Sequence, residues 1–184
     1  KSYLQDAPVD VAKEQVNYVQ VADEIIESHR TERLLKDGYI PLPKIIFPTD
    51  VVAARSLTAE KTQVIDLTHD AVDTEHDKQL MYLDIGPNTI RLYKELLLQA
   101  GTIFWNGPMG VYEDERFATG TAEIAQAIAR SSALTILGGG DTIGAIHKNN
   151  LQDRYDYVSA AGSAALEFLS GAELPGLTAI GYKP

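Results

Sequence analysis

The strand–turn–helix unit at residues 134–149 has the sequence LTILGGGDTIGAIHKN. Four apolar or β-branched residues are followed by three glycines, and apolar residues then recur at the spacing of a helix. The first four residues do not alternate with polar ones, which is the pattern of a strand whose sheet is covered by helices on both faces. We therefore predict a buried strand, a tight glycine turn and a helix over residues 141–149.

Similar units recur from Gln79 towards the end of the chain. Further apolar runs that precede glycine-containing turns cover residues 80–84, 102–105 and 157–159. The helices expected after these turns cover residues 89–100, 121–131 and 163–170. Strands and helices in alternation are typical of right-handed βαβ crossovers on a parallel sheet. The predicted fold class is α/β, an open parallel (Rossmann-like) sheet with helices on both faces.

The chain before residue 79 has a different pattern. Residues 1–38 are polar, with apolar side chains at three- and four-residue steps that predict helices. Residues 44–47 (KIIF) indicate a buried strand, which residues 48–50 (PTD) end before an apolar run at 51–54. The acidic segment 66–77 contains His69 and His76, and imidazole and carboxylate are good metal ligands. No pair in it has the helical spacing of a known metal motif, so we favour a solvated loop.

The composition limits the classes of partner. The chain has 184 residues, 26 of them acidic and 16 basic, a net charge of −10 and no cysteine. The acidic balance argues against nucleic acid or a membrane as a partner, but local backbone dipoles can still bind phosphorylated small molecules. The lack of cysteine excludes disulfides and cysteine nucleophiles and fits a reducing compartment. No apolar run approaches the about 20 residues of a membrane span, so we expect a cytoplasmic protein.

The length fits one domain, because domains usually contain about 100–200 residues. We expect a single lobe over residues 1–184, helical over residues 1–40 and built of strand–turn–helix units over residues 41–184.

The glycine turn of residues 138–142 (GGGDT) is a candidate phosphate site. Glycines allow the backbone to approach a ligand, and the free N–H groups at a helix start favour an anion. Asp141 is a good N-cap and also a natural magnesium ligand. The turn matches neither GxGxxG nor GxxxxGK[ST], and a tight turn with a capping aspartate would explain it equally well.

The segment 105–110 (WNGPMG) is a second candidate. Asn106 offers both a donor and an acceptor, Pro108 stiffens the turn, and Glu113 can accept hydrogen bonds from a sugar diol. These groups suit a ribose or a sugar phosphate, whereas a core tryptophan followed by an ordinary loop is the simpler interpretation. The chain lacks the GxSxG, HExxH and SxxK motifs of nucleophilic and zinc enzymes. Any chemistry should rest on positioning and charge neutralisation.

Four motifs in order resemble those of phosphoglycerate kinases. They are DIGP at 84–87, WNGPMGV at 105–111, GGGDT at 138–142 and LPG at 174–176. The match is continuous from about Gln79 to Leu177 and weaker at residues 48–53 and at Lys1-Ser2, while residues 3–40 align poorly. Members of that family are two-lobed: an amino-terminal lobe binds 3-phosphoglycerate and a carboxyl-terminal lobe binds the magnesium nucleotide. This chain resembles most of the carboxyl-terminal lobe.

The resemblance implies roles for individual residues. Asn106 and Pro108 would contact the phosphate–ribose region of ATP or ADP, Glu113 the ribose hydroxyls, and Leu83 the adenine, while Asp141 would hold Mg²⁺. The residues that would supply phosphate-facing N–H groups are Gly138, Gly139, Gly140 and Thr142, with Gly140 and Gly162 as candidates for contact with the transferred group. The intact enzyme would transfer a phosphoryl group between 1,3-bisphosphoglycerate and ADP, giving 3-phosphoglycerate and ATP in glycolysis.

The chain also departs from the family pattern. The family usually has glycine at the position of Tyr82, and a triple glycine where Ala161-Gly162-Ser163 stands. A degenerate, non-catalytic domain that kept the fold is therefore the alternative, and a generic sugar-phosphate-binding domain is a third interpretation. Because Lys1-Ser2 matches the middle of the family's lobe, we expect the substrate lobe or other chain segments as partners, and no turnover by this chain alone.

Overall fold

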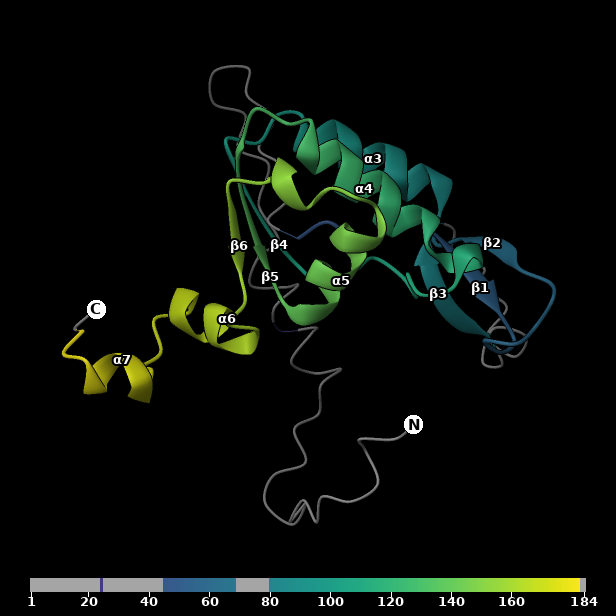
Figure 1. Cartoon of the computed structure of the whole chain (residues 1–184). Coiled ribbons are helices and arrows are strands. Elements are labelled where there is room, and N and C mark those ends of the chain that lie inside the picture. Colours follow the sequence, from purple (N-terminus) through teal and green to yellow (C-terminus); the bar gives the residue numbers. More distant parts are fainter. Residues whose placement is uncertain (1–23, 25–44, 69–79, 183–184) are drawn as a thin grey trace, which may run out of the picture. The chain divides into compact units, whose positions relative to one another are not determined.

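The structure is a computed structural model that describes residue 24, residues 45–68 and residues 80–182. The chain forms two compact units, Lys1–Phe47 and Pro48–Pro184, and the strands and helices labelled in Figure 1 belong to the second. The helices expected within residues 1–38 lie outside the described residues, apart from Glu24, which is helical. Most of the acidic segment 66–77 also lies outside them. The assignment of the whole chain to one lobe stays a prediction.

The first sheet contains three antiparallel strands in the order β2-β1-β3 (Figure 1). Its strands are β1 (Asp50–Ala54), β2 (Gln63–Asp66) and β3 (Met81–Ile85). The repeated units predicted that β3 would belong to the parallel sheet, and this prediction is wrong. β3 pairs with β1, with an irregularity between Val52 and Ala53. An apolar run predicts a strand but does not specify the direction of its neighbour.

The prediction of a strand at residues 44–47 is wrong for residues 45–47, the part that the structure describes. Residues 45–47 lie in no strand, and the side chain of Phe47 is 55% exposed. The sheet begins only after Pro48, because proline has no N–H to donate to a neighbouring strand. The buried strand at this point is β1, and its first residue, Asp50, belongs to the break expected from the sequence.

The second sheet is parallel, with β5 (Leu134–Gly138) between β4 (Thr102–Asn106) and β6 (Tyr157–Ser159). The helices are α3 (Pro87–Leu97) before β4, α4 (Thr119–Ala129) between β4 and β5, α5 (Gly140–Lys148) between β5 and β6, and α6 (Ser163–Leu169) and α7 (Pro175–Ala179) after β6. Short 3-10 helices cover Glu115–Phe117 and Gln152–Arg154. Parallel strands flanked by helices confirm the predicted α/β class.

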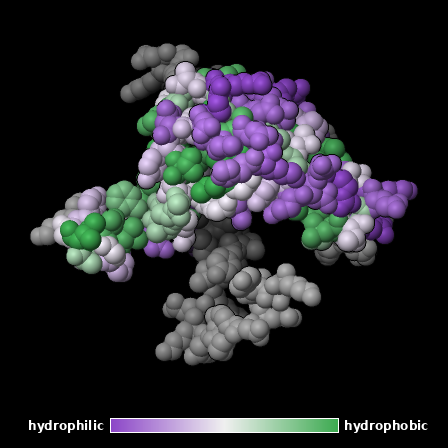
Figure 2. Space-filling model, viewed as in Figure 1, coloured by the Kyte–Doolittle hydropathy of each residue, from purple (hydrophilic) through white to green (hydrophobic). Residues whose placement is uncertain are grey.

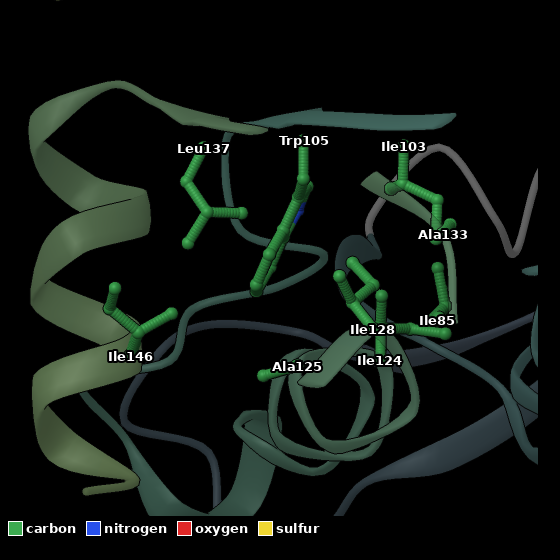
Figure 3. Packing of buried hydrophobic residues seen from close by; sticks show 9 residues of the cluster. All are labelled: Ile85, Ile103, Trp105, Ile124, Ala125, Ile128, Ala133, Leu137 and Ile146. Atoms are coloured by element: carbon green, nitrogen blue, oxygen red, sulfur yellow. The ribbon is translucent and has the colours of Figure 1, made fainter. Parts of the chain in front are cut away.

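The main core lies between the parallel sheet and helices α4 and α5. Figure 3 shows Ile103, Trp105 and Leu137 of the strands pointing towards Ile128 and Ile146 of the helices. Each of these side chains is at most 6% exposed. Burial of one such aliphatic side chain stabilises the fold by about 1.5–3 kcal/mol, so this cluster holds both helices against the sheet. Trp105 is thus a core residue, as the simpler interpretation of its motif expected.

A buried carboxylate on β1 caps helix α3. Asp50 is 1% exposed, and its side chain accepts hydrogen bonds from the N–H groups of Asn88 (3.0 Å) and Thr89 (2.7 Å). The first N–H groups of a helix have no partner within the helix, so such a carboxylate stabilises the helix start. Gly86 permits this approach, since a Cβ there would lie 2.3 Å from the Asp50 carboxyl carbon.

Hydrophobic side chains gather on α6 and α7 (Figure 2). Leu166, Phe168, Leu169 and Ile180 are all exposed by more than two fifths. The ring of Phe168 on α6 lies 5.8 Å from that of Tyr182, which follows α7. Among the residues that the structure describes, no helix has the length and apolar character needed to cross a membrane.

Candidate functional site

The carboxyl ends of the three parallel strands meet at one edge of the sheet. Asn106 at the end of β4 is paired with Gly138 at the end of β5, and Gly138 is paired with Ser159 at the end of β6. The turns that follow these strands therefore start next to one another. Open parallel sheets bind their ligands at this edge, so the candidate site is built from these turns.

The glycine turn after β5 leads directly into α5. Gly139 has φ of 91°, which favours glycine, and it is the N-cap of α5 without providing a side-chain hydrogen bond. The expectation that Asp141 caps this helix is therefore wrong: the helix starts at Gly140, and Asp141 lies inside its first turn with an exposed side chain. The first N–H groups of α5 and the carboxylate of Asp141 remain available for a ligand.

The turn after β4 is joined to the same helix. The N–H of Gly107, which has φ of 91°, donates to the hydroxyl of buried Thr142 at 2.6 Å. The side chain of Asn106 covers Gly138, because a Cβ at Gly138 would lie 2.9 Å from Asn106 Nδ2. These contacts hold the two turns together, with the exposed amide of Asn106 beside the glycines.

The middle of the loop over residues 107–113 is fixed by two neighbouring elements. The N–H groups of Met109 and Gly110 donate to the hydroxyl of Thr121 on α4 at 3.0 and 3.3 Å. The N–H of Val111 donates to the carbonyl of Leu83 on β3 at 2.9 Å. The loop is therefore held between α4 and the antiparallel sheet. Half-buried Pro108 lies within the anchored part.

The end of the loop lies against α5. The ammonium group of Lys148 donates to the carbonyls of Tyr112 (2.7 Å) and Glu113 (3.2 Å). The Tyr112 hydroxyl lies so close to Gly144 that a Cβ there would be 2.5 Å from it. Burial raises the pKa of the Tyr112 phenol, and the negative charges of Glu113 and Asp141 raise it further. The side chain of Glu113 is exposed.

A second buried carboxylate supports this region. Asp84 on β3 is 4% exposed and accepts from the N–H groups of Gly120 (2.7 Å) and Ile85 (2.9 Å). A Cβ at Gly110 or Gly120 would lie 2.5 or 2.2 Å from Asp84 Oδ1. Asp84 therefore joins the start of α4 to the loop that α4 anchors. This role of Asp84 was not predicted from the sequence. The sequence features that accompany it are the aspartate itself and the two distant glycines, Gly110 and Gly120, that leave space for its side chain.

The third turn, after β6, is also built on a glycine. Gly162 has φ of 55° and is the N-cap of α6, and a Cβ there would meet no atom within 4 Å. The neighbouring residues Ala161 and Ser163 are exposed. The N–H of Ala161 donates to the hydroxyl of Ser159 at 3.3 Å. The sequence of this turn therefore retains one glycine at the position where the backbone conformation requires it.

The predicted adenine contact lies in a different environment. The side chain of Leu83 is 4% exposed and packs with Ala54 and Phe117 in a smaller core cluster. Its neighbour Tyr82 is 51% exposed. The structure thus brings Asn106, Gly138, Gly139, Gly140 and Thr142 together, and it links Glu113 and Asp141 to them through Tyr112 and α5. It buries the side chain of Leu83 in a core.

The donors at this edge can be tested for a cation. No group of three or more His, Asp or Glu side chains that could hold a metal ion is found within residues 45–68 and 80–182. The donor set at the edge is the exposed carboxylate of Asp141 beside the N–H groups of the α5 start. Mg²⁺ is commonly bound by one or two carboxylates together with water and substrate phosphates, and this donor set fits a cation that arrives with a phosphorylated ligand.

Glycine turns at the ends of parallel strands, with an uncapped helix start, define an α/β protein suited to phosphate groups. The sequence profile described as "Phosphoglycerate kinase" matches residues 3–172. The chain belongs to the phosphoglycerate kinase family. This match includes residues 3–40, which the motif comparison aligned poorly, and it stops before the LPG motif at 174–176.

Individual relatives agree with this assignment. A phosphoglycerate kinase of Herpetosiphon aurantiacus is 42% identical over 163 residues, covering 88% of this chain and 39% of the relative. The structure of phosphoglycerate kinase from Coxiella burnetii matches with a TM-score of 0.64 at 47% identity, over 72% of this chain and 33% of its own. The crystal structure of phosphoglycerate kinase from Pyrococcus horikoshii OT3 matches with a TM-score of 0.71 at 36% identity, over 89% of this chain and 36% of its own. The chain thus spans little more than a third of these relatives.

Proposed function

We propose that this chain is a nucleotide-binding lobe that takes the magnesium complex of ADP or ATP at the carboxyl edge of its parallel sheet. The observation that carries the proposal is the start of α5. A positive-φ glycine caps the helix, and no side chain forms a capping hydrogen bond with its first N–H groups. Such a helix start favours phosphate oxygens through hydrogen bonds and the helix dipole.

Neighbouring groups would complete the nucleotide site. Asn106 has an exposed amide next to Gly138 and would contact the phosphate–ribose region together with Pro108. Glu113, held at the end of the same loop, would accept hydrogen bonds from the ribose hydroxyls. The N–H groups of Gly138, Gly139, Gly140 and Thr142 would face the phosphates. Leu83 would contact adenine through a local rearrangement, since its side chain is buried.

The cation belongs to the substrate in this proposal. Asp141 would hold the Mg²⁺ that arrives with the nucleotide, and the cation would supply charge neutralisation for the phosphates. The position of Asp141 in the first turn of α5 supports this role, because its exposed side chain is not used as a cap. The carboxylate would otherwise repel the phosphates.

We propose the family's reaction for a protein that contains this lobe together with the rest of a phosphoglycerate kinase. The acyl-phosphate bond of 1,3-bisphosphoglycerate would break, and its phosphoryl group would pass to the terminal oxygen of ADP, releasing 3-phosphoglycerate. The N–H groups of Gly140 and Gly162 would stabilise the charge on the transferred group. The substrate lobe is the implied partner and the cytoplasm the implied location. This chain spans little more than a third of its relatives and would not turn over alone.

Calorimetric titration of the 184-residue chain with ADP tests the proposal. With Mg²⁺ present, D141A should bind ADP about tenfold more weakly than the wild type, a loss of about 1.4 kcal/mol. With EDTA, the same variant should bind free ADP as tightly as the wild type or more tightly, because a repelling carboxylate is gone. D153A removes an exposed acid from the 3-10 helix Gln152–Arg154 and is the matched charge control. Equal effects of D141A with and without Mg²⁺ would contradict the role of Asp141.

The alternative, a degenerate domain that lost its ligand, rests on Tyr82, Ala161 and Ser163. The variant Y82G distinguishes a site that the tyrosine blocks from a site that still binds nucleotide. A large gain in ADP affinity in Y82G would mean that the tyrosine blocks the site, and an unchanged affinity would mean that the nucleotide accommodates it. If neither the wild type nor Y82G binds ADP at millimolar concentration, the chain still belongs to the family but the proposed nucleotide binding is refuted.

A further inference from the structure

We infer that Lys148 is a positioning residue, which holds the loop end carrying Glu113 on helix α5 and thereby sets the contact of Glu113 with the ribose. The inference rests on the proposed function for its ligand. It assigns a role to a residue that no motif singled out.

The geometry of α5 is the first step. Asp141, Gly144 and Lys148 are spaced by three and four residues, and such positions share one face of a helix. Seven residues separate the first from the last, which corresponds to about 10 Å along the axis. This face therefore runs from the proposed phosphate end of α5 to its C-terminus, where Lys148 is the last residue.

The loop contacts α5 at three levels, on this face at Gly144 and Lys148 and on the buried side of the helix at Thr142. At the start of α5, the Gly107 N–H donates to Thr142. In the middle, the Tyr112 hydroxyl occupies the space that a side chain at Gly144 would fill. At the end, Lys148 donates to the carbonyls of Tyr112 and Glu113. The same helix thus presents Asp141 at one end and fixes the backbone of Glu113 at the other.

Lys148 could either attract an anionic ligand or hold the loop in place, and its hydrogen-bond partners distinguish these two roles. Its ammonium group donates to two neutral backbone carbonyls, at 2.7 and 3.2 Å. Lys94, in contrast, pairs with the carboxylate of Glu123 at 2.7 Å on helices α3 and α4. A lysine that served only to attract an anionic ligand would need no such fixed backbone partners. Lys148 uses its charge to fix the chain on which Glu113 is carried.

The Asp114 N–H donates to the Val111 carbonyl at 3.1 Å and closes the turn that contains Glu113, and Lys148 ties that turn to α5. Thr121 and the Leu83 carbonyl hold residues 109–111, before the loop turns towards Glu113. Asp114 is fixed by hydrogen bonds with Arg116 on the following 3-10 helix, beyond Glu113. Glu113 itself is exposed, so its direction depends on how its backbone is held. Removal of the Lys148 ammonium should leave both flanking anchors in place and loosen the segment between them.

The test compares K148M with K94M in the 184-residue chain. Each substitution removes one ammonium group and keeps a long apolar side chain, and only Lys148 contacts the loop. The probes are the magnesium complexes of ADP and of 2′-deoxyADP. If Glu113 binds the ribose, the wild type should prefer ADP by about tenfold, the factor for a hydrogen bond to a charged group. K148M should reduce that preference to about twofold, while K94M should keep it.

A double-mutant cycle with E113Q shows whether Lys148 acts through Glu113. K148M should weaken ADP binding in the wild type and have little further effect in E113Q. If K148M instead weakens ADP and 2′-deoxyADP equally, and does so in E113Q as well, then Lys148 acts as a simple charge and the inference is wrong. The inference is also wrong if K148M behaves like K94M. K148Q is a second variant that retains a hydrogen-bond donor and should lie between K148M and the wild type.

Hydrogen exchange of the peptide covering residues 107–114 separates this inference from the proposed function. K148M should increase exchange in that peptide without nucleotide, and K94M should not. If the wild type binds no ADP, the proposed function fails while this measurement still tests the contact. Unchanged exchange in K148M would overturn the positioning role whatever the result for ADP.

Discussion

Replacement of Asp84 by asparagine tests the contribution of a buried carboxylate to the stability of this unit. Asp84 uses one carboxylate oxygen for the N–H of Ile85 and the other for the N–H of Gly120. Asparagine offers a single acceptor oxygen, so one of the two N–H groups would face an NH₂ group instead. The substitution keeps the size of the side chain, and the measured change therefore reports hydrogen bonding and charge rather than a cavity.

The expected loss follows from these contacts. A hydrogen bond to a charged acceptor contributes about 1.5–3 kcal/mol, and the carboxylate at the start of α4 adds about 0.3–1 kcal/mol through the helix dipole. Removal of a buried charge returns part of this, because burial opposes ionisation and raises the pKa of Asp84. We expect a net loss of about 2 kcal/mol in the free energy of unfolding at pH 7.

Urea denaturation of the wild type and D84N measures this loss. D153N is the control, since Asp153 is exposed and the same change there should cost less than about 0.5 kcal/mol. The reasoning is refuted if D84N is as stable as D153N.

The pH dependence gives an independent check on Asp84. A pKa that is higher in the folded state means that folding favours the protonated acid, so the wild type gains stability as pH falls through the folded-state pKa. D84N has no proton to gain at this position, and its stability deficit relative to the wild type should widen as pH falls from neutral towards the ordinary pKa of an aspartic acid, about 4. A deficit that narrows would mean that the two N–H groups outweigh burial.

Two further predictions concern packing and a buried hydroxyl. G120A should destabilise the chain by about 1–3 kcal/mol, because a Cβ at residue 120 would lie 2.2 Å from Asp84 Oδ1, whereas G101A, with no atom within 4 Å of its Cβ, should have little effect in the same urea titration. Y155F should cost about 1 kcal/mol at pH 7, since the Tyr155 hydroxyl donates to the carbonyl of Ala125 at 3.0 Å. Burial raises the pKa of Tyr155 to about 12, so thermal melting should show the wild type losing its advantage over Y155F as pH rises from about 10 towards 12.

The units around the parallel strands could be predicted because their signals are local. The apolar run of β5, the three glycines and the helical spacing of α5 all lie within 16 residues, and the structure differs there by one residue at each end of the helix. The difference at the start arises because Gly139 adopts positive φ and takes the N-cap position from Asp141. Periodicity indicates a helix well but does not fix the residue at which it begins.

The contacts that hold the site could not be predicted, because they join distant residues. Asp84 reaches a glycine 36 residues away, and Lys148 reaches carbonyls 35 and 36 residues away. A lysine is common at a helix end, and aspartate, although depleted in strands, does not by its presence indicate which distant residue it contacts. The antiparallel pairing of β3 could not be predicted for the same reason, since a long segment that includes β2 separates β3 from its partner β1. The positions of Asn106 and the glycines followed instead from the rule that ligands bind at strand ends.

The contact between Asn106 and Gly138 constrains how this sequence can change. The two residues share the space of one side chain, since the amide of Asn106 occupies the volume that a Cβ at residue 138 would need. Substitutions at these positions are therefore not independent: an alanine at 138 would displace the Asn106 amide, because its Cβ would lie 2.9 Å from Asn106 Nδ2. A change at Asn106 alone would remove the polar group, and a change at Gly138 alone would move it. The position of the amide at the strand edge is thus set by the glycine beside it as well as by Asn106 itself.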